Sequence, residues 1–169
     1  AVFQELKENE KAKSCFEKAI EIDPNYVNAH NNIGNIFQEL VEYQKAKSCF
    51  EKAIEIDPNY SPAHNNLGSI FRELGEYQKA KSCFEKAITI NPNYEKAYNN
   101  LGNIFKELGE YQKAKSCYEK AIAINPNYVD AHTNLTALCI RTLDDLEKSI
   151  NSSYKTLKIY RKNFKFIDQ

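Results

Sequence analysis

The chain has 169 residues, and its 23 basic and 23 acidic side chains give a formal net charge of zero. This balance argues against a general polyanion binder, so we expect no nucleic-acid partner. The sequence has no run of about 18 apolar residues, so it predicts no membrane span.

The chain repeats itself with a period of 34 residues. Segments 29–60, 63–94 and 97–128 carry nearly the same sequence. A fixed period of this length is typical of repeat proteins, in which each unit covers its neighbour. We therefore divide the chain into a truncated first unit, three complete units and a degenerate last unit: 1–26, 27–60, 61–94, 95–128 and 129–169.

The first unit matches only the later part of the repeat. Its sequence predicts the end of a first helix, a turn and a complete second helix within 1–26. Because Ala1 falls inside the first helix of the pattern, this start suggests a fragment of a longer protein.

Each complete unit predicts two amphipathic helices joined by a tight turn. In 29–40, Ile33 and Phe37 lie on an apolar stripe, and asparagines occupy the opposite face. A Leu-Gly-Glu-Tyr turn follows at 74–77 and 108–111, because glycine readily adopts the left-handed conformation that ends a helix. Val41 replaces this glycine in the first complete unit, which predicts either a strained turn or a turn of another shape.

The last unit departs from the pattern in several places. Thr136 replaces the glycine of the first helix, and Cys139 replaces its aromatic residue. We expect a turn at 141–145, one residue longer than the others, and then a capping second helix. The tail is basic, with six basic residues and one acidic residue in 148–169.

The conserved spacing within the units carries a family resemblance. In the third complete unit it consists of Leu101, Gly102, Phe105, Ala114, Tyr118 and Pro126. The chain resembles the tetratricopeptide-repeat (TPR) family over nearly its whole length. The resemblance implies an all-α fold, a right-handed αα superhelix of stacked antiparallel helix pairs, and a protein-interaction scaffold. One departure is systematic, because histidine or tyrosine replaces the early tryptophan of the family at His30, His64, Tyr98 and His132.

The cysteines and histidines follow the repeat and therefore predict no chemistry. Four cysteines are spaced by 34 residues, so helix packing separates them beyond the reach of a disulfide. We expect free thiols, and hence a reducing, cytoplasmic compartment. The histidines are expected to pack within or between repeats. We predict no metal, no cofactor and no enzyme activity, because no catalytic or phosphate-binding motif is present.

Asparagines recur on the polar face of the predicted first helices. A carboxamide both donates and accepts, so an array of them could pair with the backbone of an extended peptide. The TPR resemblance places the array on a concave groove, and it is similar to that of O-linked N-acetylglucosamine transferase. The same amides could instead only tie adjacent helices together. The predicted peptide-binding residues are Asn31, Asn32, Asn35, Asn65, Asn66, Asn99, Asn100, Asn103, Asn134 and Lys96.

Three other functions can be compared with this prediction. TPR cochaperones grip acidic chaperone tails with a clamp of Lys, Arg and Asn, but only Lys96 supplies a cation at the corresponding positions here. Binding of a chaperone tail is therefore not expected. The chain could also be the accessory arm of a multidomain enzyme, such as a glycosyltransferase or sulfotransferase. Finally, an uncovered end of the stack could dock end to end on another copy as a homo-oligomer.

Overall fold

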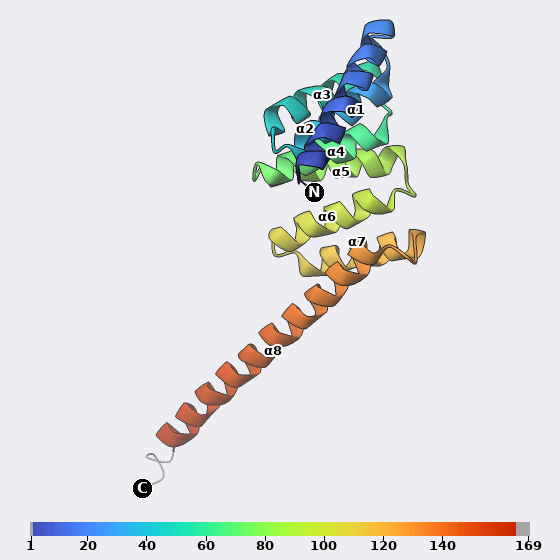
Figure 1. Ribbon diagram of the computed structural model, residues 1–169. Coiled ribbons are helices and arrows are strands. Elements are labelled where there is room, and N and C mark those ends of the chain that lie inside the picture. Colours follow the sequence, from blue (N-terminus) through green and yellow to red (C-terminus); the bar gives the residue numbers. More distant parts are fainter. Residues whose placement is uncertain (1, 165–169) are drawn as a thin grey trace.

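The computed structural model describes the backbone of residues 2–164 and the side chains of residues 9–147, 150, 151 and 154. This part of the chain contains eight helices and no strand. Seven helices form a stack of antiparallel neighbours, and the eighth runs from the end of the stack out and away from it (Figure 1). Their bounds are α1 Val2–Ile22, α2 Val27–Glu39, α3 Tyr43–Ile56, α4 Ser61–Glu73, α5 Tyr77–Ile90, α6 Glu95–Glu107, α7 Tyr111–Ile124 and α8 Val129–Phe164.

The loops between units stop the second helices in the same way each time. The side chain of Asp57 accepts a hydrogen bond from the backbone N–H of Asn59 at 2.9 Å, across Pro58. Asp23, Asn91 and Asn125 make the equivalent contact in the other loops. A proline cannot continue the helical hydrogen bonds, and the short polar side chain before it satisfies the freed backbone N–H.

The turn inside each complete unit needs a left-handed residue. Gly75 and Gly109 adopt φ values of +75° and +76° there. Val41 occupies the equivalent position with φ +61°, and it is the only non-glycine residue with positive φ in the described part of the chain. The turn therefore keeps its shape and Val41 carries the strain, because α2 and α3 pack together on either side of it.

A second set of glycines allows the two helices of a unit to approach closely. A Cβ atom added to Gly68 would lie 2.7 Å from the Phe84 ring. Gly34 meets Phe50 and Gly102 meets Tyr118 in the same way. These rings are fully buried within a core that runs without interruption along the stack.

The truncated first unit does not form the predicted turn. Residues 2–22 make one continuous helix, α1, where the sequence predicted the end of a first helix, a turn and a second helix. Only five residues precede Lys7, which replaces the turn glycine. A helix of that length is too short to hold a hairpin closed, so the helical conformation continues through Lys7.

The predicted turn at 141–145 is also wrong. Residues 129–164 form a single helix of 36 residues. No glycine is present at 141–145 to adopt positive φ, and each residue there tolerates a helical backbone. Thr142 accommodates its hydroxyl by donating a hydrogen bond to the carbonyl oxygen of Cys139 at 2.9 Å. The last unit is therefore an extended helix rather than a hairpin.

Candidate functional site

The asparagines of the first helices are hydrogen-bonded from one unit to the next. Nδ2 of Asn100 donates to Oδ1 of Asn65 at 3.0 Å, and Nδ2 of Asn134 donates to Oδ1 of Asn99 at 2.9 Å. These bonds join α4 to α6 and α6 to α8. In each case the second residue of an Asn-Asn pair, or the Asn aligned with it, donates to the first residue of the preceding pair.

Asn66 is the most extensively bonded member of this ladder. Its Nδ2 donates to Oδ1 of Asn31 at 3.0 Å and to Oδ1 of Asn35 at 2.9 Å. Its own Oδ1 accepts a bond from Asn65 at 3.2 Å. The amides thus tie α2 to α4, which is one of the two roles that the sequence left open for them.

Burial divides the ladder into two groups. Asn31, Asn65 and Asn99 are only 4%, 5% and 4% exposed, so they hold the helices together and present little to a ligand. The remaining predicted asparagines keep part of their surface in solvent. We call this group the amide surface: Asn32, Asn35, Asn66, Asn100, Asn103 and Asn134.

Three of the predicted residues have a different setting from the rest. Asn103 accepts a hydrogen bond from the hydroxyl of Tyr118 at 2.8 Å, so it ties α6 to α7. Asn32 is partly exposed, and no side-chain hydrogen bond joins it to the described residues. Lys96 is fully exposed on α6, and no ion pair is formed by it within the described part of the chain.

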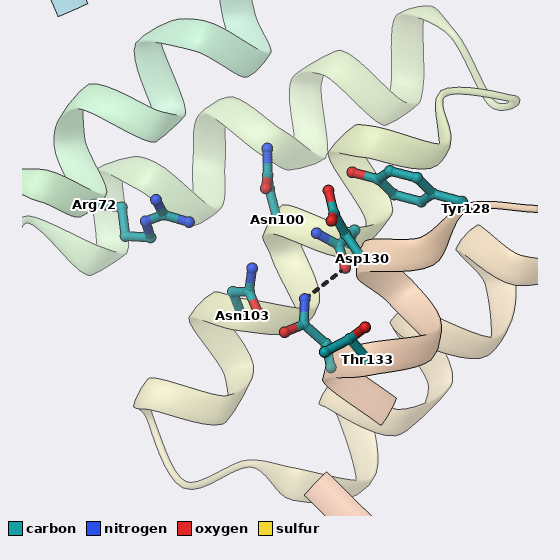
Figure 2. Close-up of a pocket in the computed structure, with 8 residues that line it drawn as sticks. Arg72, Asn100, Asn103, Tyr128, Asp130 and Thr133 are labelled. Carbon is teal, nitrogen blue, oxygen red and sulfur yellow. Dashed lines mark hydrogen bonds between the residues drawn. The ribbon is translucent and has the colours of Figure 1, made fainter. Parts of the chain in front are cut away.

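A cavity of about 320 Å³ opens on the amide surface between α4, α6 and α8. Figure 2 shows its polar lining, which includes the hydrogen bond between Asn134 and Asn99. Four residues of the lining were predicted and four were not. The lining residues are Arg72, Asn99, Asn100, Asn103, Tyr128, Asp130, Thr133 and Asn134.

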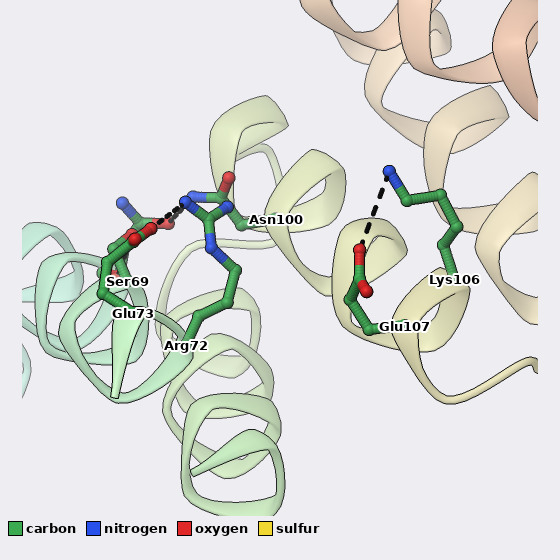
Figure 3. A network of polar contacts seen from close by, with 7 residues as sticks. Ser69, Arg72, Glu73, Asn100, Lys106 and Glu107 are labelled. Atoms are coloured by element: carbon green, nitrogen blue, oxygen red, sulfur yellow. Dashed lines mark hydrogen bonds and ion pairs between the residues drawn. The ribbon is translucent and has the colours of Figure 1, made fainter. Parts of the chain in front are cut away.

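The missed residues carry the charge of the cavity. Arg72 pairs with Glu73 at 2.6 Å and lies beside Asn100 (Figure 3). Asp130 lies on α8, exactly one period of 34 residues after Lys96. Burial, and then the negative charge of Asp130, raises the pKa of Tyr128 to about 12, so Tyr128 remains a neutral hydroxyl. Following the Lys96 position through the repeats would have found Asp130, but no sequence signal marked Tyr128.

The histidines stabilise loops and do not pack in the core. The Nε2 atoms of His30, His64 and His132 hydrogen-bond the carbonyl oxygens of Pro24, Pro58 and Pro126 at 3.0, 2.9 and 2.9 Å. The rings are partly or fully exposed, so the expected packing within or between repeats is wrong. The apolar stripe was misleading because a ring at its edge can reach back to the preceding loop.

The cysteines are free thiols, as the spacing predicted. Burial raises the pKa of Cys83 and of Cys117 to about 11, so both stay protonated near neutral pH. Cys15 and Cys139 are instead exposed. Across the described residues, no group of three or more His, Cys, Asp or Glu side chains could hold a metal ion. No helix among them is long and apolar enough to cross a membrane.

Stacked helix hairpins with a continuous core and linked first helices define an α-solenoid repeat protein. Family models support this class over most of the chain. Models described as "Tetratricopeptide repeat" match residues 27–60 and 59–127, and one described as "TPR repeat" matches residues 2–41. The chain belongs to the tetratricopeptide repeat family.

Several solved structures are similar to this chain. MamA shares 25% identity with a TM-score of 0.67, covering 92% of this chain and 94% of that chain. Pseudomonas aeruginosa pilF shares 26% identity with a TM-score of 0.75, covering 84% and 65%. The first TPR of Spaghetti (RPAP3), bound to the HSP90 peptide SRMEEVD, shares 25% identity with a TM-score of 0.65, covering 69% and 93%. No curated protein matches the sequence significantly.

Proposed function

We propose that this TPR protein is an interaction scaffold that binds an extended peptide segment along its amide surface. The Spaghetti domain, which has the same fold, was solved with a peptide bound, and this supports a peptide as the ligand class. The observation that carries the proposal is the cavity between α4, α6 and α8. It brings ladder asparagines together with Arg72 and Asp130.

The cavity has the donors and acceptors that a peptide backbone needs. Asn100 and Asn134 use Nδ2 to bond the preceding helix, and no side chain in the described part of the chain donates to their Oδ1 atoms. Those oxygens and the Asp130 carboxylate can accept from peptide N–H groups, and Arg72 can donate to peptide carbonyls. Such contacts are independent of the peptide's side chains, so they favour a broad range of sequences.

The charges favour a neutral or mixed-charge peptide over a purely acidic one. The guanidinium of Arg72 is already paired with Glu73, which offsets its attraction for a ligand carboxylate. Asp130 adds a negative charge to the same cavity and disfavours an acidic segment. Both observations support the expectation that this groove is not a clamp for acidic chaperone tails.

The test changes the cavity without cutting the bonds between repeats. Fluorescence anisotropy with a peptide library would identify ligands of the parent chain. Arg72→Gln and Asp130→Asn keep the ladder bonds, and each should weaken binding about tenfold by removing a charged hydrogen-bonding group. Lys120→Ala, an exposed site on α7, is the matched control and should bind as the parent does.

The thermal midpoint of each variant separates loss of contact from loss of fold. All three variants should melt close to the parent chain, because the changed side chains are partly or fully exposed. Equal peptide affinities for the parent, Arg72→Gln and Asp130→Asn would show that peptides do not bind in this cavity.

A further inference from the structure

One face of α8 lacks the cover that the other first helices have. On α6, Gly102 and Phe105 lie against α7 and are buried. One period later on α8, Thr136 and Cys139 occupy the same two positions, and both are exposed. The face that a second helix covers in every complete unit is therefore open to solvent in the last unit.

This open face continues along α8 as an apolar stripe. Leu143, Leu146 and Ile150 are 64%, 57% and 58% exposed. Together with Cys139 they are spaced by four, three and four residues. This alternation is the pattern of a seam between two packed helices. Apolar residues at this spacing on a helix surface indicate a partner helix rather than solvent.

The complete units show which segment covers this face. There, the residues that follow the turn form the second helix and pack back on the first. In the last unit the turn is replaced by helix, so the residues after 145 continue along the axis of α8 and away from the stack (Figure 1). A straight helix cannot fold onto itself, so a helix of another chain must provide the cover.

We propose that a second copy of this chain provides it, by exchange of the outer halves of α8. Residues 146–164 of each copy pack antiparallel on residues 131–143 of the other, in the place that α7 takes on α6. Exchange of identical segments is a low-cost route to a symmetric dimer, because each copy uses contacts that the hairpin would otherwise make.

The register of the complete units supports this pairing. Moved on by one period and lengthened by the one extra residue of the last unit, the α6–α7 register pairs Cys139 with Ile150 and Leu143 with Leu146. These are the four residues of the exposed stripe, and each pair has one member on either side of the hinge at 144–145. The exchanged helices thus bury the stripe on itself.

A disulfide test can identify the segment that covers the face. In a Cys15→Ser background, which removes another exposed thiol, Ile150→Cys should form a disulfide with Cys139 under mild oxidation. The linked product should run as a covalent dimer on a non-reducing gel, and peptide mapping should locate the 139–150 bond. Asp145→Cys is the control on an exposed face of α8 off the stripe, and it should not give this dimer.

The outcome depends on which chain supplies the second cysteine. A 139–150 disulfide within a monomer would mean that residue 150 folds back in its own chain, and would overturn the exchange. Failure of the pair to form more dimer than the Asp145→Cys control would also overturn it.

Light scattering over a dilution series provides an independent measurement on the full chain. The parent should be a dimer, and Leu143→Glu should raise its dissociation constant about tenfold or more, because a charge would be buried in the seam. Circular dichroism should show that the variant retains its helices. A parent chain that stays monomeric at every concentration would reject the proposal. Leu143 does not line the amide cavity, so peptide binding would be unchanged in either case.

Discussion

Val41 occupies a backbone position that the equivalent turns give to glycine. Its φ of +61° is costly for a β-branched residue, and its side chain is 64% exposed, so little packing offsets the strain. The turn nevertheless keeps its shape, because the two packed helices determine the path between them. The sequence identified this anomaly but left open whether the turn would change shape or become strained.

Replacing Val41 with glycine should stabilise the protein. The left-handed backbone costs a non-glycine residue about 1–2 kcal/mol, and greater freedom of glycine in the unfolded chain cancels part of the gain. We expect Val41→Gly to raise the free energy of unfolding by about 1 kcal/mol in urea denaturation. Gly75→Val, the reverse change in the next unit, should lower it. Unchanged or lower stability in Val41→Gly would contradict strain at this position.

At the scale of the element, each complete unit depends on a glycine that lies against a ring. The space beside Gly68 is filled by Phe84, so the pair acts as one packing unit between α4 and α5. The spacing of these residues identified the TPR resemblance, but it did not show that the glycine faces the ring. That contact depends on how closely the two helices approach.

Gly68→Ala should therefore destabilise the protein by overpacking. Its Cβ would lie 2.7 Å from the ring, and such crowding typically costs about 1–3 kcal/mol. A double-mutant cycle with Phe84→Leu tests the cause, because the smaller side chain should make Gly68→Ala less costly. Equal costs of Gly68→Ala with Phe84 and with Leu at position 84 would mean that the ring is not what limits the site.

At the scale of the whole molecule, the amide ladder couples successive units along the stack. Asn32 and Asn100 share one repeat position, but only Asn100 donates to a buried asparagine of the preceding unit, Asn65. The same residue type at the same repeat position is therefore a structural tie in one unit and a free amide in another. Position in the repeat does not separate these roles.

The difference predicts unequal effects of the same substitution. Asn100→Ala should lower the free energy of unfolding by about 1–3 kcal/mol, because it leaves the buried Oδ1 of Asn65 without this donor. Asn32→Ala should change it by less than about 0.5 kcal/mol, as expected of a partly exposed side chain without such a bond. Chemical denaturation of both variants would compare them directly. Similar losses would show that the ladder bonds add little to stability.

The sequence by itself determined the helix pairs, the turns of the complete units, the free thiols and the family. These follow from local rules, because proline ends a helix, glycine permits the left-handed turn, and the period of 34 repeats the same apolar faces. Only the tertiary structure decided the continuity of α1 and α8, since a hairpin forms only when its two helices stabilise each other. It also decided which amides tie the units and which remain exposed beside Arg72 and Asp130, because those contacts join residues about one repeat or more apart.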